Sequence, residues 1–186
     1  WQEALGPGCS IALDVAFSYK LIGIRKLAKA LEPFNVLWLE AETLDPMALK
    51  SVRESTSTPI CIGESCYRTQ GFKPFFENHA FDYVMPDTVW NGITMGKKVA
   101  DYANTYDIMF APHNSHGCLA GWQAAHLCAT LENFKILEYE QDDVPWRNEI
   151  VTHPTIIVDG YIEMSDRPGL GCDVIEEIVA EHPPQA

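Results

Sequence analysis

The stretch Pro59-Ile-Cys-Ile-Gly-Glu64 is a short apolar run that ends on an acidic residue, which is typical of a buried β-strand. The same pattern occurs upstream at Val36-Leu-Trp-Leu-Glu40 and downstream at Ile108-Met-Phe-Ala-Pro-His113. Six acidic or histidine residues end such runs at intervals of 23 to 26 residues: Asp14, Glu40, Glu64, Asp87, His113 and Glu138. One strand, a loop and a helix fill such an interval, so we expect these residues at equivalent places in successive βα units.

Strands and helices are expected to alternate along most of the chain. The apolar runs predict strands at 10–17, 36–40, 59–64, 81–87, 108–113 and 134–138. Apolar residues at helical spacing, with proline and glycine signals at the ends, predict helices at 21–31, 46–54, 71–78, 92–106 and 121–131. After these the pattern changes to a hairpin at 155–164, centred on Asp159-Gly160, and a closing helix at 174–182.

This order predicts the α/β class and a partial TIM (β/α) barrel of about six βα units, with a C-terminal hairpin and helix. A closed barrel has eight units and is typically about 250 residues long, whereas this chain has 186. We therefore expect residues 1–186 to form a single barrel domain that lacks its first strands. The chain begins at Trp1 instead of Met, which is consistent with a missing front.

The composition restricts the class of partner. The chain has 26 Asp and Glu against 13 Lys and Arg, for a formal net charge of -13, and such a field repels nucleic acid and anionic membrane surfaces. No apolar stretch approaches the roughly 20 residues of a membrane span. The six cysteines form no CxxC pair, which favours reduced thiols in a cytoplasmic protein over a disulfide framework or a zinc site.

Three of the strand-end carboxylates suit a metal ion. Asp14, Glu40 and Glu64 end consecutive predicted strands, so their side chains are expected to converge on one point. Hard oxygen ligands with positions left for water and substrate are what Mg²⁺ prefers. A single acidic residue after a strand often only caps the next helix, but three in the same phase favour the metal site.

The remaining strand-end residues suit proton transfer. Asp87 and His113 end neighbouring strands, so the carboxylate can hold one ring nitrogen and raise the basicity of the other. Glu138 lies where a carboxyl group can hydrogen-bond a substrate oxygen that gains charge, although Glu140 shares its face. Asn114 and His116, in the loop after His113, are expected to contact substrate.

An ordered series of motifs runs along the chain: Leu13-Asp14, Trp38-Leu-Glu40, Pro59 to Gly63-Glu64, Met85-Pro-Asp87, Gly92-Ile-Thr94, Pro112-His113, Leu137-Glu138 and Pro168-Gly-Leu-Gly171. This series resembles the C-terminal barrel of the enolase superfamily, and most of all the mandelate racemase/muconate lactonizing enzyme-like subgroup. The resemblance implies Mg²⁺-dependent abstraction of the proton α to a carboxylate through an enediolate. It implies Asp14, Glu40 and Glu64 as metal ligands, His113 with Asp87 as the proton-transfer pair, and Glu138 opposite the metal.

The sequence departs from the family pattern at Ala16, where a polar residue is usual, and at Asn91-Gly92, where two glycines are usual. A lysine-bearing strand and a capping domain would lie upstream of Trp1. Dehydration of an acid sugar is the first expectation, and racemisation or epimerisation of a 2-hydroxy acid is the second. A non-catalytic, metal-binding barrel fragment is the third. The resemblance further implies a small carboxylate substrate and a homo-oligomer, and we expect this chain alone to be inactive.

Overall fold

A parallel sheet forms the centre of the computed structural model, which describes residues 1–140 and 144–183. Its five strands are hydrogen-bonded in sequence order. They are β1 (Ala12–Asp14), β2 (Trp38–Glu40), β3 (Ile60–Ile62), β4 (Tyr83–Val84) and β5 (Met109–Phe110). Parallel strands in sequence order with helices between them form a barrel wall, so the predicted α/β partial barrel is confirmed.

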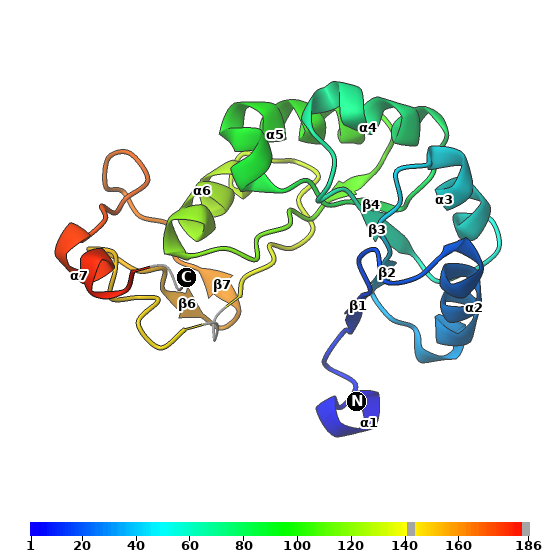
Figure 1. Cartoon of the computed structure of the whole chain (residues 1–186), viewed down its shortest axis with the longest axis horizontal. Coiled ribbons are helices and arrows are strands. Elements are labelled where there is room, and N and C mark those ends of the chain that lie inside the picture. Colours follow the sequence, from blue (N-terminus) through cyan, green and yellow to red (C-terminus); the bar gives the residue numbers. More distant parts are fainter. Residues whose placement is uncertain (141–143, 184–186) are drawn as a thin grey trace.

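The connecting helices cover the outer side of the curved sheet, as Figure 1 shows from α2 round to α6. Helix α1 (Gln2–Leu5) comes before β1. The helices that follow the successive strands are α2 (Leu21–Leu31) with the short 3₁₀ helix η1 (Glu32–Phe34), α3 (Pro46–Arg53), α4 (Arg68–Glu77), α5 (Thr88–Asn104) and α6 (Cys118–Cys128). Among the described residues, no helix has the length and apolar character needed to cross a membrane.

The two faces of the sheet pack against different partners. Alternate strand residues, such as Leu39, Ile60 and Phe110, join the large core beneath the helices. The residues between them point to the concave side and form a second, smaller cluster of Trp38, Cys61, Met85 and Ala111. Because side chains alternate along a strand, a residue two positions beyond a member of the inner cluster faces the same concave side.

The predicted sixth strand at 134–138 is reduced to a single parallel bridge between Phe110 and Phe134. The backbone of Phe110 donates to Asn133 O (2.7 Å) and accepts from Lys135 N (2.8 Å), so the segment lies where the next strand of the wall belongs. Ile136 remains 40% exposed. An edge segment with apolar side chains left in solvent has little burial to hold it in an extended register, and this explains the shortening.

Three helices begin earlier than the sequence predicts: α4 starts at Arg68 instead of Gly71, and α5 and α6 differ in the same direction. Helix α6 starts at Cys118 instead of Gly121, because Gly121 lies inside the helix, where a Cβ atom would come within 2.8 Å of the Tyr139 ring. Helix α5 starts at Thr88 instead of Gly92, since Asp87 caps a first turn before a break at Gly92 (φ 69°, ψ 166°). In α6, Gly121 therefore allows a close contact with Tyr139, and in α5, Gly92 allows a kink.

The C-terminal part follows the predicted change of pattern. Strands β6 (Ile157–Val158) and β7 (Tyr161–Ile162) form an antiparallel hairpin, with positive φ at both turn residues, Asp159 and Gly160. Helix α7 (Glu176–Glu181) is shorter than the predicted helix at 174–182. Trp146 stacks on His182 with ring centroids 4.3 Å apart, which holds the segment after α7 against the turns at 145–150.

A hydrogen-bonded carboxylate at the amino-terminal end of the sheet gives a stability prediction. Glu32 accepts hydrogen bonds from the Ser57 backbone N–H (2.8 Å) and the Thr56 hydroxyl (3.0 Å), and it pairs with Lys29 (2.9 Å). The Ser57 hydrogen bond and the Lys29 ammonium lower the pKa of Glu32 from 4.5 to about 2. A carboxyl whose folded pKa is depressed stabilises the fold above its unfolded pKa and loses that effect as the pH falls through the folded value.

Glu32→Gln should therefore lower the free energy of unfolding at pH 7, and the difference from the unchanged protein should disappear between about pH 4.5 and pH 2. Urea unfolding at a series of pH values measures this. Glu77→Gln is the control, because the pair of Glu77 with Lys73 (3.5 Å) is exposed on the surface of one helix. An equal, pH-independent loss in both variants would contradict the prediction.

Candidate active site

The strand-end residues gather at one edge of the sheet, on its concave side. Asp14 and Glu40 are the last residues of β1 and β2 and are paired in register. Glu40, Asp87 and His113 each lie two positions beyond a member of the inner cluster, so they continue the inward-facing set. The regular interval in the sequence therefore corresponds to a shared position at the carboxyl ends of the strands, where barrel proteins carry their chemistry.

Glu64 reaches the same region through a break in the alternation. It lies three residues beyond Cys61, and Gly63 between them has φ 137°, a conformation that side chains rarely adopt. A Cβ atom at Gly63 would approach Phe72 Cε1 to 2.9 Å and the Met85 backbone to 3.2 Å. Glycine is required here both for the φ angle and for the close packing.

Gly63→Ala should therefore cost about 1–3 kcal/mol of stability and displace Glu64. Thermal unfolding measures the first effect, and metal affinity measures the second. Gly117→Ala is the matched control, since Gly117 has a negative φ (-71°) and an added methyl group would meet no described atom within 4 Å. Equal stability of the two variants would contradict the assignment of strain to Gly63.

The carboxylates at this edge repel one another. Glu40 is only 6% exposed, and burial raises its pKa to about 8, with Asp14, Glu138, Glu64 and Glu42 adding to the effect. Burial also raises the pKa of Glu64, and the neighbouring His113 opposes that rise. Each of these groups therefore lies in the field of the others, in an arrangement that a bound cation would stabilise.

The three expected Mg²⁺ ligands are near one another without forming a tight cluster. Asp14 Oδ1 accepts a hydrogen bond from the Ala16 backbone (2.6 Å), which orients that carboxylate. Among the described residues, the group whose ligand atoms all lie within 4.8 Å of one another is Asp87, His113 and His116, so Asp14, Glu40 and Glu64 are more widely spaced. These three carboxylates nevertheless fit Mg²⁺, because they offer hard oxygen donors and because a divalent cation would offset the repulsion between their negative charges.

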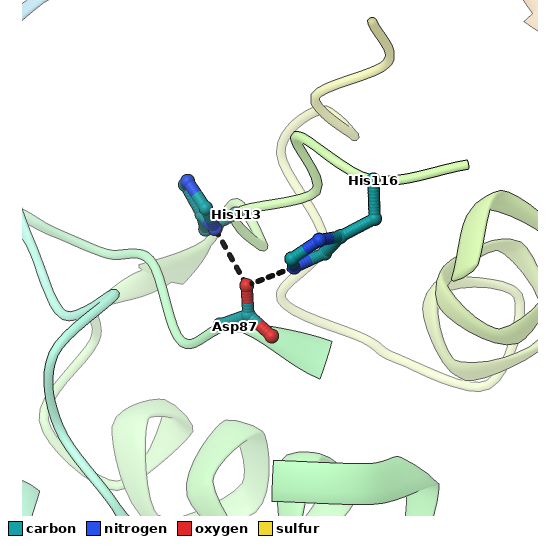
Figure 2. Close-up of side chains that lie close together, drawn as sticks. All are labelled: Asp87, His113 and His116. Atoms are coloured by element: carbon teal, nitrogen blue, oxygen red, sulfur yellow. Dashed lines mark hydrogen bonds and ion pairs between the residues drawn. The ribbon is translucent and has the colours of Figure 1, made fainter. Parts of the chain in front are cut away.

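Asp87 connects two histidines, as Figure 2 shows. Its Oδ2 atom lies 2.7 Å from His113 Nδ1 and 2.7 Å from His116 Nε2, while Oδ1 accepts from the Trp90 backbone N–H (2.8 Å). Burial of this fully enclosed carboxylate favours its neutral form, but the hydrogen bonds from His113, Trp90 and His116 lower the pKa of Asp87 below its usual value. Asp87 thus caps α5 and orients imidazole rings at the same time.

The second nitrogen of His113 faces the carboxylates. Its Nε2 atom is 3.1 Å from Glu64 Oε2 and 3.3 Å from the Ser115 hydroxyl. Burial opposes protonation of the ring, but the hydrogen bond to Asp87 and the charges of Glu138 and Glu64 outweigh it and raise the pKa of His113 to about 9. The ring is therefore fixed on one side and directed toward the proposed metal ligands on the other.

Glu138 is fixed by the loop after His113. The Asn114 backbone donates to Glu138 Oε2 (2.8 Å), and the Asn114 side-chain amide donates to Glu138 O (3.0 Å). Asn114 is fully buried, and within the described part of the chain its Oδ1 atom has no hydrogen-bond partner. The structure thus shows Asn114 positioning Glu138, while the expected substrate contacts of Asn114 and His116 stay predictions.

Sequence reasoning missed two buried groups beside this site. Glu42, 2% exposed, accepts from Gly63 N (2.6 Å) and the Ser65 hydroxyl (2.9 Å), and so holds the loop that carries Glu64. Its position two residues beyond Glu40 was an available signal. Arg147, 3% exposed, donates to His116 O (2.6 Å). Arg147 comes after Glu138, the last residue of the regularly spaced series, so the spacing did not predict it.

Part of a (β/α) barrel wall with acidic and histidine side chains at the carboxyl ends of its strands defines a barrel protein with an enzyme-type site. The chain belongs to the enolase C-terminal domain-like family, whose model matches residues 1–178. This membership confirms the resemblance seen in the motif series.

Curated relatives are named as sugar-acid dehydratases or as members of such a dehydratase family. The chain is 32% identical to D-xylonate dehydratase of Haloferax volcanii, over 97% of this chain and 44% of that protein. It is 33% identical to a D-galactonate dehydratase family member of Pseudarthrobacter chlorophenolicus, over 99% and 46%. The chain therefore spans less than half of the length of these relatives.

Solved structures have the same fold. A mandelate racemase/muconate lactonizing enzyme-like protein from Rubrobacter xylanophilus is 39% identical, with a TM-score of 0.92 over 98% of this chain and 48% of that one. A protein of Burkholderia xenovorans strain LB400, provisionally named an L-alanine-DL-glutamate epimerase and solved with magnesium and fumarate, is 35% identical, with a TM-score of 0.96 over 99% and 46%.

Proposed function

We propose that this chain supplies the metal-binding and histidine side of the active site of an enolase-superfamily acid-sugar dehydratase. The observation that carries the proposal is the position of His113, with Nδ1 on Asp87 (2.7 Å) and Nε2 on Glu64 (3.1 Å). An imidazole held by one carboxylate and directed at another is placed to move a proton at the edge of a metal site. The dehydratase names of the relatives support this reaction class.

Asp14, Glu40 and Glu64 would hold Mg²⁺, as their oxygen donors and the raised pKa of Glu40 support. When bound, the ion offsets the negative charge that grows on the substrate carboxylate as its α-proton leaves. The magnesium in one related structure is further support. The Nε2 atom of His113 would either take the α-proton or donate a proton to the departing hydroxyl. Asp87 would keep the Nδ1 atom of His113 protonated.

Glu138 and the loop residues would bind the substrate. Glu138, held by the two hydrogen bonds from Asn114, would hydrogen-bond a substrate carboxylate oxygen. His116 is half-buried beside His113, with ring centroids 5.9 Å apart, and would contact the substrate from that side. We propose a small sugar-acid substrate, since the relatives are named for sugar acids. We also propose a homo-oligomer, as the family resemblance implies, and a cytoplasmic location, as the scattered cysteines without a CxxC pair favour.

A racemase or epimerase is the second candidate, favoured by the epimerase name given to a structure with a TM-score of 0.96. Both reactions remove the α-proton. Dehydration then expels the hydroxyl from the neighbouring carbon, whereas epimerisation returns a proton to the opposite face of the α-carbon. A non-catalytic barrel fragment is the third. It would bind Mg²⁺ and exchange no substrate proton.

The test is an assay of the longest natural form of the protein with Mg²⁺ and a panel of sugar acids in D₂O. Formation of a 2-keto acid supports the dehydratase, and deuterium at the α-carbon with inversion supports the epimerase. Mg²⁺ binding without either product over the whole panel would contradict both catalytic proposals.

A further inference from the structure

Arg147 is a buried cation outside the set of strand-end residues. It lies in the turns of the segment 144–150, is 3% exposed, and its backbone N–H donates to Val144 O (3.2 Å). Burying a guanidinium is costly unless its N–H donors are used in hydrogen bonds. The atoms that accept hydrogen bonds from the guanidinium therefore show which segments the Arg147 side chain connects.

The guanidinium of Arg147 joins two loops of the candidate site. One terminal nitrogen donates to the carbonyl oxygen of His116 (2.6 Å), and the other donates to the carbonyl oxygen of Glu140. Its plane also contacts the Tyr139 ring, with Cζ 4.9 Å from the ring centroid. A planar fork with fixed donor directions sets the distance between two carbonyl groups more rigidly than a lysine would.

Each loop held by Arg147 carries a group of the proposed active site. His116 reaches Asp87 Oδ2 through its side chain, so the Arg147 contact fixes the backbone of the same residue that donates to the central carboxylate. Tyr139 and Glu140 directly follow Glu138 in the chain. Fixing them limits how far Glu138 can move relative to the histidines.

The main-chain oxygen of Arg147 adds a third connection. It accepts from the thiol of Cys118 (3.3 Å), the first residue of α6, directly after the histidine loop. Residue 147 thus contacts both ends of the stretch from His116 to Cys118. Loss of the side chain would release the His116 end and leave the Cys118 end in place.

We propose that Arg147 is a positioning residue that holds His116 on Asp87 and keeps the histidine loop in register with the Glu138 segment. The inference rests on the proposed function, since it gives Arg147 a role only through residues assigned to that site. It adds to that site a residue from the C-terminal segment, beyond the strand ends that the family motifs mark.

The test is NMR of the longest natural form of the protein with ¹⁵N in the histidine rings. In the unchanged protein the proton on His116 Nε2, which points at Asp87, should be protected from exchange with water and give a ring signal. Arg147→Met keeps the apolar bulk but removes the donors, and we expect that signal to be lost while the backbone amide spectrum outside the site is retained. Arg167→Met is the matched control, because Arg167 is exposed and its guanidinium donates to the nearby Ser165 hydroxyl (3.3 Å), outside the histidine loop.

A folded Arg147→Met protein that keeps the protected His116 signal would overturn the proposal. If that variant fails to fold, the terminal N–H protons of Arg147 in the unchanged protein decide the question: slow exchange and hindered rotation support the proposal, and fast exchange with free rotation overturns it. Neither measurement uses substrate or metal. The result for Arg147 therefore stands even if the proposed reaction is not found. A negative result for Arg147 likewise leaves the proposed reaction untouched.

Discussion

Replacement of His113 by Asn should lower turnover of the longest natural form of the protein by about 10²–10⁴-fold, the range over which positioned acid–base groups contribute. Asn can occupy similar space but cannot exchange a proton near neutral pH. Nδ1 of His113 is held by Asp87 (2.7 Å), so the unchanged ring presents Nε2 in one orientation. The measurement is α-proton exchange and product formation with the substrate identified from the panel of sugar acids.

Metal binding separates loss of the imidazole from loss of the site. Mg²⁺ affinity of His113→Asn should stay within a few-fold of the unchanged protein, because the ring is not among the proposed ligands. Asp87→Asn should reduce turnover less than His113→Asn, since the imidazole is still present there. His79→Asn is the control: His79 is exposed at φ 49°, a conformation that Asn tolerates. Near-normal turnover by His113→Asn would refute its role.

Replacement of Glu40 by Gln should weaken Mg²⁺ binding by on the order of tenfold or more, since even groups behind the ligands contribute 10–100-fold in metal sites. Glu40 is the most buried of the three proposed ligands, and its carboxylate lies in the field of Asp14, Glu64 and Glu138. The neighbouring negative charges destabilise the ionised form of Glu40, and the same charges attract a divalent cation. Calorimetry with Mg²⁺, and the rise in Tm that Mg²⁺ produces, measure the effect.

The control for metal binding is Glu54→Gln, which removes one charge far from the strand ends. Glu54 follows α3 and forms an exposed pair with Lys50 (3.8 Å). The affinity of this variant for Mg²⁺ should be unchanged, so a loss would indicate a general charge effect. Unchanged affinity in both Glu40→Gln and Glu64→Gln would exclude the proposed ligand set.

The order of elements and the edge where the site forms could be predicted from the sequence. Strand, loop and helix have narrow length ranges, so the interval from Asp14 to His113 placed each residue at or just beyond the end of an observed strand before any tertiary contact was known. Alternation along strands is equally local, and it placed Glu40, Asp87 and His113 on one face. The expected nearness of Asp87 and His113 is observed as a hydrogen bond.

Other features depended on packing between distant segments. The single bridge at Phe134 replaced the sixth strand because burial at that edge is incomplete, and Gly121 lies inside α6 because Tyr139 packs on it. The second imidazole on Asp87 arises because the loop after His113 turns back toward α5.

What the sequence alone determined is therefore the series of βα units and the residue types at their ends, since backbone sterics and side-chain alternation act over a few neighbouring residues. Only the tertiary structure decided which groups are hydrogen-bonded to one another and which buried charges hold the loops. Glu42 contacts a backbone N–H 21 residues away, and Arg147 contacts a carbonyl 31 residues away. Such pairings depend on loop conformation and desolvation, which no local pattern in the sequence specifies.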